Sequence, residues 1–306
     1  MQIICFFSEN VVQNSIKAWI LAARPKTLAA AAVPIVIASS LALTADAGLF
    51  HWTACCLCFL FAFVMQIDAN FVNDYFDFRR GNDDETRLGP KRACAEGWVS
   101  SRAMIWAIII TTTMACIIGL PLIAYGGMEM ILVGIACILF CFLYTTTFSY
   151  IAMGDILVLL FFGIVPVCCT YYVELAGTGI PLPGKTLWMS VACGLFIDTL
   201  LIINNYRDYD NDKKAGKRTL AVIIGKKAMS VVYLMIVPTS LTIGIVCLDF
   251  SLPSISVTII ILAFHLPTWK KMVTIGQGRA LNKILGMTAR NILLYGILTS
   301  ISIILS

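Results

Sequence analysis

The sequence predicts an all-α polytopic membrane protein, and its composition, its apolar runs and its charge distribution all support this fold class. Of the 306 residues, 59% are apolar and 13% are charged, whereas soluble domains are about 45–50% apolar and about 25% charged. Runs of about 20 apolar residues recur along the chain, each long enough to cross a hydrocarbon core of about 30 Å. This composition argues against a nucleic-acid-binding protein, a secreted disulfide-stabilised domain and a soluble Rossmann or barrel enzyme.

The first 26 residues are expected to form an N-terminal interfacial segment and not a membrane span. The stretch from Met1 to Phe7 is too short for a cleavable signal peptide, lacks a basic region and precedes polar residues. The stretch from Val11 to Ala23 mixes apolar and polar side chains, which predicts an amphipathic helix in the membrane interface.

About nine membrane-spanning helices are expected to follow, within a single domain that covers residues 1–306. Each predicted helix is a predominantly apolar run with few charges. The predicted spans are Thr27–Ala45, Trp52–Tyr75, Ala103–Leu120, Met128–Tyr144, Ile156–Val173, Leu187–Tyr206, Ala228–Leu248, Ser254–Trp269 and Asn291–Ser306.

The basic residues lie almost entirely on one side of this predicted bundle. Of the 22 Lys and Arg residues, 21 precede the first span or follow the second, sixth and eighth spans, and only Lys185 lies opposite. Loops rich in Lys and Arg stay in the cytoplasm by the positive-inside rule. We therefore expect a cytoplasmic N-terminus and cytoplasmic loops at residues 78–102 and 207–227.

Two polar clusters interrupt the apolar pattern at the cytoplasmic ends of the second and sixth predicted spans. Residues three, four or seven positions apart share one face of a helix, and the members of each cluster have this spacing. Asn73 and Asn204 are 131 positions apart, which predicts two pseudo-repeated halves. The clusters are Asn70, Asn73, Asp74 and Asp77 in the first half, and Asn204, Asp208 and Asp212 in the second.

The two clusters are typical of a site that binds Mg²⁺ and a diphosphate. Carboxylates crowded near a bilayer repel one another unless cations neutralise them. Mg²⁺ suits such oxygen-rich sites, sharing its coordination shell between a few carboxylates and substrate phosphates, while Lys and Arg contact phosphate directly. We expect this site in a central cavity of the bundle, capped by the loops 78–102 and 207–227. The expected metal ligands are Asp74, Asp77, Asp83, Asp208 and Asp212, and the expected diphosphate contacts are Arg87, Lys91, Arg92, Lys217 and Arg218.

Three stretches of sequence resemble the UbiA superfamily of intramembrane prenyltransferases. They read ARPKTL (23–28), NDYFDFRRGNDDETRLGPKR (73–92) and NNYRDYDNDKKAGKRTLAV (204–222). More narrowly, they are similar to the 1,4-dihydroxy-2-naphthoate polyprenyltransferases of menaquinone synthesis, over residues 23 to about 225. In the wider superfamily the first motif often reads Asn-x-x-x-Asp-x-x-x-Asp, which places a second Asp four positions after the one that corresponds to Asp77. Gly81 stands there in this chain, and the next acid is Asp83.

The resemblance implies transfer of a polyprenyl group from an allylic polyprenyl diphosphate to 1,4-dihydroxy-2-naphthoate, with loss of CO₂ and diphosphate, to give demethylmenaquinol. It implies Mg²⁺ as cofactor, membrane lipid as the surroundings and a bacterial inner membrane as the location. Arg24 and Lys26 are then expected to hold the acceptor carboxylate or the diphosphate, and Tyr144 to stabilise the allylic cation by a cation–π contact. The implied catalytic residues are Asn73, Asp77, Asn204 and Asp208.

Two other interpretations remain open on the sequence. The same chemistry can serve another acceptor, such as 4-hydroxybenzoate, a glycerol phosphate ether lipid or a tetrapyrrole. A cation-coupled transporter also has intramembrane carboxylates and repeats, although its polar residues are expected near the bilayer midplane. Asp68 and Asp198 lie deeper in their spans than the two clusters, so each is either a functional residue or the partner of a neighbouring helix.

Overall fold

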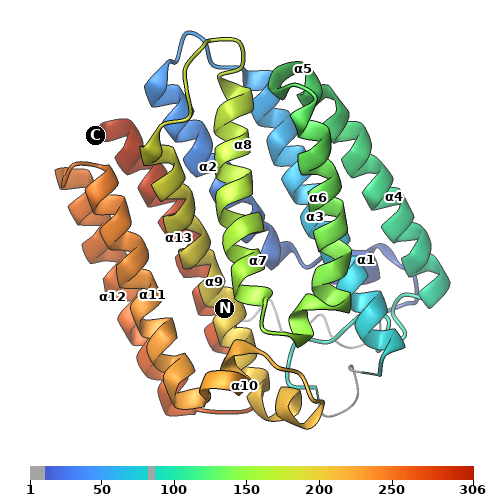
Figure 1. Cartoon of the computed structure of the whole chain (residues 1–306). Helices are drawn as coiled ribbons and strands as arrows, with labels where there is room; N and C mark the ends of the chain where they lie inside the picture. The colour runs from blue at the N-terminus through green and yellow to red at the C-terminus, as the bar shows by residue number, and fades with distance from the viewer. Residues whose placement is uncertain (1–10, 82–86) are drawn as a thin grey trace.

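The structure is a computed structural model that describes residues 11–81 and 87–306, and over these residues it is all-helical. Within this part of the chain, nine helical segments are long and apolar enough to cross a membrane, which confirms the predicted fold class. The segments run side by side as one bundle (Figure 1). They are α2 (Pro25–Ala45), α3 (Trp52–Arg79), α4 with η2 and α5 (Ser101–Gly119, Leu120–Leu122, Ile123–Gly126), α6 (Glu129–Thr146), α7 with η4 and α8 (Gly154–Leu159, Leu160–Ile164, Val165–Glu174), α9 (Gly184–Lys214), α11 (Lys226–Cys247), α12 (Leu252–Ile275) and α13 (Leu281–Leu305).

The nine predicted spans match these nine segments, and the two largest differences in their bounds lie at polar ends. Helix α9 continues eight residues past the predicted end at Tyr206, and α13 begins at Leu281, ten residues before the predicted start at Asn291. Both extensions carry charged residues. The apolar pattern used to predict the spans stops there, although the backbone remains helical. The expected loop at 207–227 is therefore helical up to Lys214 and again in α10 (Leu220–Ile224).

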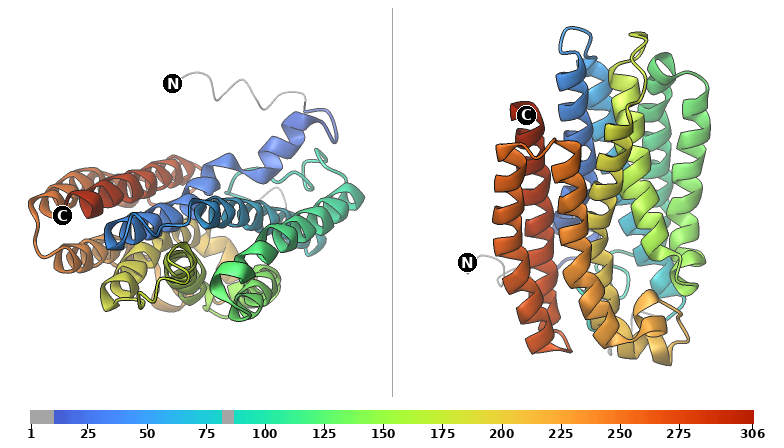
Figure 2. Two further views of the ribbon diagram at one scale, coloured as in Figure 1. Left: turned by 90° about the horizontal axis from the view of Figure 1, so that it is seen from above. Right: turned by 60° about the vertical axis from the view of Figure 1, so that its left-hand side comes forward.

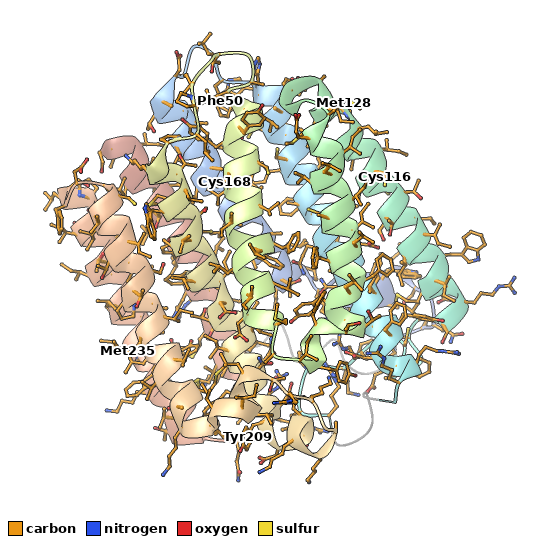
Figure 3. The ribbon with its side chains drawn as sticks, viewed as in Figure 1. Phe50, Cys116, Met128, Cys168, Tyr209 and Met235 are labelled. Carbon is orange, nitrogen blue, oxygen red and sulfur yellow. The ribbon has the colours of Figure 1, made fainter. Side chains whose placement is uncertain are left out.

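One end of the bundle carries most of the charge, and we call it the basic end. It contains α1 (Ile16–Ala23), the segment 87–100, η3 (Phe148–Tyr150), α10 and the connection between α12 and α13. The C-terminus lies at the opposite end (Figure 1). Figure 3 shows nitrogen-tipped side chains gathered at the basic end near Tyr209, whereas Phe50 and Met128 mark the opposite end. The cation asymmetry in the sequence is thus an asymmetry between the two ends of the bundle.

The bundle has a well-packed side and a peripheral side (Figure 2). Helix α13 packs on α2 and α9 packs on α11, and the Phe196 and Tyr295 rings stack with their centroids 4.1 Å apart. In contrast, only 11% of the most apolar stretch of Ser101–Gly126 and 6% of that of α6 is buried. Apolar helices this exposed have no stable place in water, so lipid is the medium that fits them.

Helices α7, α8 and α9 cross at two glycines. A Cβ on Gly163 would lie 2.6 Å from the carbonyl oxygen of Ser190 and 2.7 Å from the Cα of Gly194. Gly163 belongs to the π-helical turn η4, which separates α7 from α8. Small residues let membrane helices approach closely, and this crossing presses the α7–α8 segment against α9.

Candidate active site

Two cavities meet inside the basic half of the bundle. A polar cavity of about 400 Å³ opens toward the basic end, and an apolar cavity of about 460 Å³ lies deeper among the membrane-spanning helices. The cavities share a rim, so a ligand with a polar head and an apolar tail can occupy both. The rim residues that line both cavities are Thr27, Asn73, Tyr144, Leu200, Leu201 and Asn204.

Most of the residues singled out in the sequence line the polar cavity. Helix α3 contributes the first polar cluster and α9 the second, because their charged ends lie at the same end of the bundle. The predicted site residues found on this lining are Arg24, Lys26, Asn73, Asp77, Arg87, Arg92, Tyr144, Asn204, Asp208, Asp212 and Lys217.

On the α3 side, the carboxylate of Asp77 is paired with Arg92. The Arg92 Nη2 atom donates to Asp77 Oδ2 over 3.0 Å, and only 8% of the Arg92 side chain is exposed. One turn earlier, Asn73 Oδ1 accepts a hydrogen bond of 2.9 Å from the Thr145 hydroxyl on α6. These contacts fix the first cluster against the segment 87–100 and against α6.

The Asp74 carboxylate contacts the backbone of the segment 87–100 and does not line the cavity. Its carboxylate oxygens accept hydrogen bonds from the backbone N–H groups of Ala93, at 2.9 Å, and Cys94, at 2.8 Å. The Arg24 Nη2 atom lies 3.7 Å from Asp74 Oδ2. Asp74 is buried and lines neither cavity, so the expectation that it holds metal finds no support in this placement.

On the α9 side, Asp208 accepts two hydrogen bonds from its sequence neighbour Arg207. The guanidinium Nε and Nη2 atoms donate to the two carboxylate oxygens over 2.8 and 2.6 Å. Arg207 also donates to Asn282 on α13, and Asn282 in turn donates to the Leu88 carbonyl oxygen over 2.8 Å. Arg207 and Asn282 both line the polar cavity. In the sequence, Arg207 is only one of several cations in the expected loop 207–227, and no motif marks Asn282.

Lys91 and Arg218, two further expected site residues, lie away from both cavities. The Lys91 Nζ atom pairs with Glu96 over 2.6 Å, and 59% of the Lys91 side chain is exposed. The Arg218 side chain is exposed and lines neither cavity, although its backbone N–H donates to the Tyr150 carbonyl oxygen. Asp83 lies outside the described residues. Sequence proximity to a motif therefore did not separate residues that face the cavity from residues that face solvent.

Asp68 and Asp198 have different surroundings. Asp68 accepts hydrogen bonds from the hydroxyl groups of Thr111 and Thr112, so it joins α3 to α4. This is the structural role that the sequence left open for it. Asp198 is buried on α9, lines neither cavity and accepts no such hydroxyl hydrogen bond among the described residues.

The polar cavity fits Mg²⁺ by the chemistry of its donors. Asp77, Asp208 and Asp212 offer carboxylate oxygens, and Asn73 and Asn204 offer amide groups. Within the described residues, no three His, Cys, Asp or Glu side chains come together as a preformed metal site. One or two carboxylates with substrate phosphates complete a Mg²⁺ shell, so a diphosphate would supply the missing oxygens.

The apolar cavity fits a hydrocarbon chain. Its lining is aliphatic and aromatic along most of its depth, and it includes Phe140 and Phe161, whose ring centroids are 4.8 Å apart. Apolar walls exclude water and favour burial of an alkyl chain. The arrangement can therefore place a polar head among cations and carboxylates while keeping the adjoining carbon atoms dry.

The sequence matches known prenyltransferases over most of its length. The model of the UbiA prenyltransferase family matches residues 31–291. The chain is 34% identical over 227 residues to the 1,4-dihydroxy-2-naphthoate octaprenyltransferase of Haemophilus influenzae, which covers 71% of this chain and 72% of that protein. It is 35% identical over 219 residues to the protein of the same name from Escherichia coli, covering 69% of each.

The fold is similar to that of solved UbiA homologues. The homologue from Aeropyrum pernix superposes with a TM-score of 0.67 at 15% identity, covering 88% of this chain and 96% of that one. A homologue from Archaeoglobus fulgidus bound to DMAPP and Mg²⁺ gives a TM-score of 0.60 at 14% identity, covering 92% and 98%. At these identities the likeness concerns the fold alone.

Proposed function

The chain belongs to the UbiA prenyltransferase family, and we propose that it transfers a polyprenyl group to 1,4-dihydroxy-2-naphthoate. The donor is an allylic polyprenyl diphosphate, and the products are demethylmenaquinol, CO₂ and diphosphate. The observation that carries the proposal is the shared rim of the two cavities, where a diphosphate head would meet its prenyl tail. The choice of acceptor rests on the two naphthoate octaprenyltransferases to which the chain is similar.

The polar cavity is suited to the diphosphate. Arg24, Arg92 and Lys217 line it and provide charge-assisted hydrogen bonds to phosphate oxygens. Asp77 and Asp208 are the proposed metal ligands on the two sides of the cavity. When bound with the diphosphate, Mg²⁺ supplies Lewis-acid stabilisation of the negative charge that builds on the leaving group.

The rim is suited to the reacting carbon atom. Cleavage of the allylic C–O bond leaves a carbocation, which water would quench, so a dry wall next to the diphosphate is required. Tyr144 lines both cavities and offers its ring to the cation. Asn73 and Asn204 stand on the same rim and help to orient the diphosphate end of the donor. The acceptor ring carbon then forms the new C–C bond and loses its carboxyl group as CO₂.

The transporter interpretation is not supported by this arrangement. A transporter is expected to place its polar residues near the bilayer midplane. Here the cations and carboxylates line the cavity at the basic end, and the deeper cavity is apolar. We further propose that the basic end faces the cytoplasm of a bacterial cell, since Lys and Arg favour that side.

The proposed function is tested by incubating the purified protein with Mg²⁺, an allylic polyprenyl diphosphate and carboxyl-labelled dihydroxynaphthoate. We expect prenylated naphthoquinol and labelled CO₂ in equal amounts, loss of both in EDTA, and recovery on adding Mg²⁺. Parallel reactions with 4-hydroxybenzoate, a glycerol phosphate ether lipid and a tetrapyrrole identify the acceptor. Full turnover in EDTA would exclude the metal, and faster turnover with another acceptor would replace naphthoate.

A further inference from the structure

We propose that the outer surface of α12 and α13 binds an anionic membrane phospholipid, whose phosphate group lies among Lys271, Lys283 and Arg290. We call this surface the α12–α13 face, and it consists of Phe264 and Lys271 on α12 with Lys283 and Arg290 on α13. Figure 2 shows the two helices side by side at one edge of the bundle. The inference concerns a surface outside both cavities and does not rest on the proposed function.

This part of the chain is basic and has no acidic residue of its own. Between Phe250 and Ser306 the sequence contains five Lys and Arg residues and no Asp or Glu. Helix α12 packs on α11 and α13, and none of these three helices contains an acidic residue. Anionic phospholipids attract basic segments at the cytoplasmic surface of a membrane, so they match this charge.

The cations of the α12–α13 face lie at two levels. Phe264 and Lys271 are seven positions apart on α12, as are Lys283 and Arg290 on α13, so each pair shares one side of its helix. Seven positions correspond to about 10 Å along a helix. All four side chains are exposed, and the Arg290 guanidinium lies 4.9 Å from the centre of the Phe264 ring. The two lysines therefore lie nearer the basic end, and Arg290 lies deeper.

Arg290 lies deeper than a side chain that marks the membrane interface. Trp269 on α12 donates its indole N–H to the Ser230 carbonyl oxygen over 2.9 Å, and tryptophan is typical of the interface. Phe264, at the level of Arg290, is five positions further from the basic end than Trp269, which is about 7 Å along the helix. An arginine at this depth is costly unless it has a partner.

The protein supplies only part of that partner. The Arg290 Nη2 and Nε atoms donate to Asn291 Oδ1 over 3.0 and 3.4 Å. Among the described residues, no carboxylate pairs with Arg290. A guanidinium group has five N–H donors, and a helical side chain points toward the N-terminus of its helix. For Arg290 this direction is toward the basic end, where lipid phosphate groups lie.

Beyond Arg290 the same surface becomes apolar. Ile260 precedes Phe264 by one turn on α12, and Ile297 follows Arg290 by seven positions on α13. Ile260 is 40% exposed and Ile297 is 46% exposed. Cations nearer the basic end and apolar side chains beyond them match the phosphate and the acyl chains of one lipid molecule. A free phosphate ion would contact only the cations, so the surface fits a phospholipid better.

The test measures binding of phosphatidylglycerol with a pyrene-labelled acyl chain to the purified full chain in detergent. Energy transfer from the protein's tryptophans reports the bound lipid, and phosphatidylcholine with the same chain gives the background. We expect tighter binding of phosphatidylglycerol. Arg290→Gln should weaken it about 10-fold or more, as for loss of a charge-assisted contact. Lys271→Gln and Lys283→Gln should each weaken it about fivefold, and Arg290→Lys should recover part of the loss.

Lys270→Gln is the matched control, because Lys270 is exposed on the same helix but points away from the α12–α13 face. It should change the affinity by less than about twofold. Equal losses at positions 270 and 271, or equal binding of the two lipids, would overturn the site and leave a diffuse attraction. Displacement of the labelled lipid by millimolar inorganic phosphate would overturn the choice of a phospholipid. If Arg290→Gln does not fold, the double variant of the two exposed lysines decides the same question.

Discussion

An arginine holds each of the two carboxylates that are proposed to meet the metal. Arg92 pairs with Asp77, and Arg207 grips both oxygens of Asp208. Such pairing holds both carboxylates in place before a ligand arrives, and it brings guanidinium groups to the same cavity. A diphosphate can then be bound by the arginines while their carboxylates remain available to the metal.

The first residue-scale prediction separates two adjacent cations that the sequence grouped together. Arg92→Ala should lower kcat/KM for the prenyl diphosphate about 10- to 100-fold, because a buried charge-assisted contact is lost. Lys91→Ala should cost less than about twofold, because an exposed ion pair contributes little. Arg92→Lys should recover part of the activity, since the charge survives without the planar fork. Equal losses at both positions would contradict this assignment.

At the residue scale, the sequence predicted the composition of the site better than its contacts. Spacing within one helix placed Asn73 with Asp77, and Asn204 with Asp208, because helical periodicity fixes a shared face. Contacts between helices could not be predicted from the sequence, because no local pattern links Arg207 to Asn282, which lies 75 positions later.

At the scale of elements, α3 and α9 are the two helices that carry the polar clusters. They are 28 and 31 residues long, and both run past the apolar region into the basic end. The extra turns hold Asp77, Asp208 and Asp212 on rigid helix instead of loop. The sequence predicted the existence of these helices well and their polar ends poorly, because hydropathy falls before the helix ends. The internal duplication of the two halves stays a prediction.

The element-scale prediction concerns the glycine crossing of α9 with η4. Gly163→Ala should lower the unfolding free energy by about 1–3 kcal/mol, the usual cost of overpacking. The added Cβ would meet backbone atoms, which cannot rotate away. The control is Gly244→Ala on α11, where a Cβ would meet nothing within 4 Å. We expect a lower melting temperature in detergent for Gly163→Ala alone. Unchanged melting of both variants would show that the helices separate freely.

At the scale of the whole molecule, the bundle is strongly asymmetric between its ends. The basic end contains the polar cavity, α1, α10 and the segment 87–100. Lys185 lies in the first turn of α9, at the opposite end. In a membrane this distribution favours one orientation. Orientation decides which compartment must supply the diphosphate donor and the acceptor.

The whole-molecule prediction is the side on which each end can be labelled. In a variant without the twelve native cysteines, single cysteines replace Lys91 and Ala215 at the basic end, and Ala47 and Leu182 at the other. Membrane-impermeant thiol reagent added to intact cells should label only the second pair, and labelling of the first pair should require opened membranes. The reverse pattern would place the basic end outside the cytoplasm.

The shared rim of the cavities has a consequence for prenyl chain length. Moving one five-carbon unit from water into hydrocarbon gains about 4 kcal/mol, at about 0.8 kcal/mol per carbon. A membrane-borne donor never makes that transfer, because its tail leaves lipid and enters a cavity that is equally apolar. Each added unit therefore contributes almost nothing to affinity, and the diphosphate head sets the strength of binding. The length of the tail on the product would then follow the donor that the surrounding membrane holds.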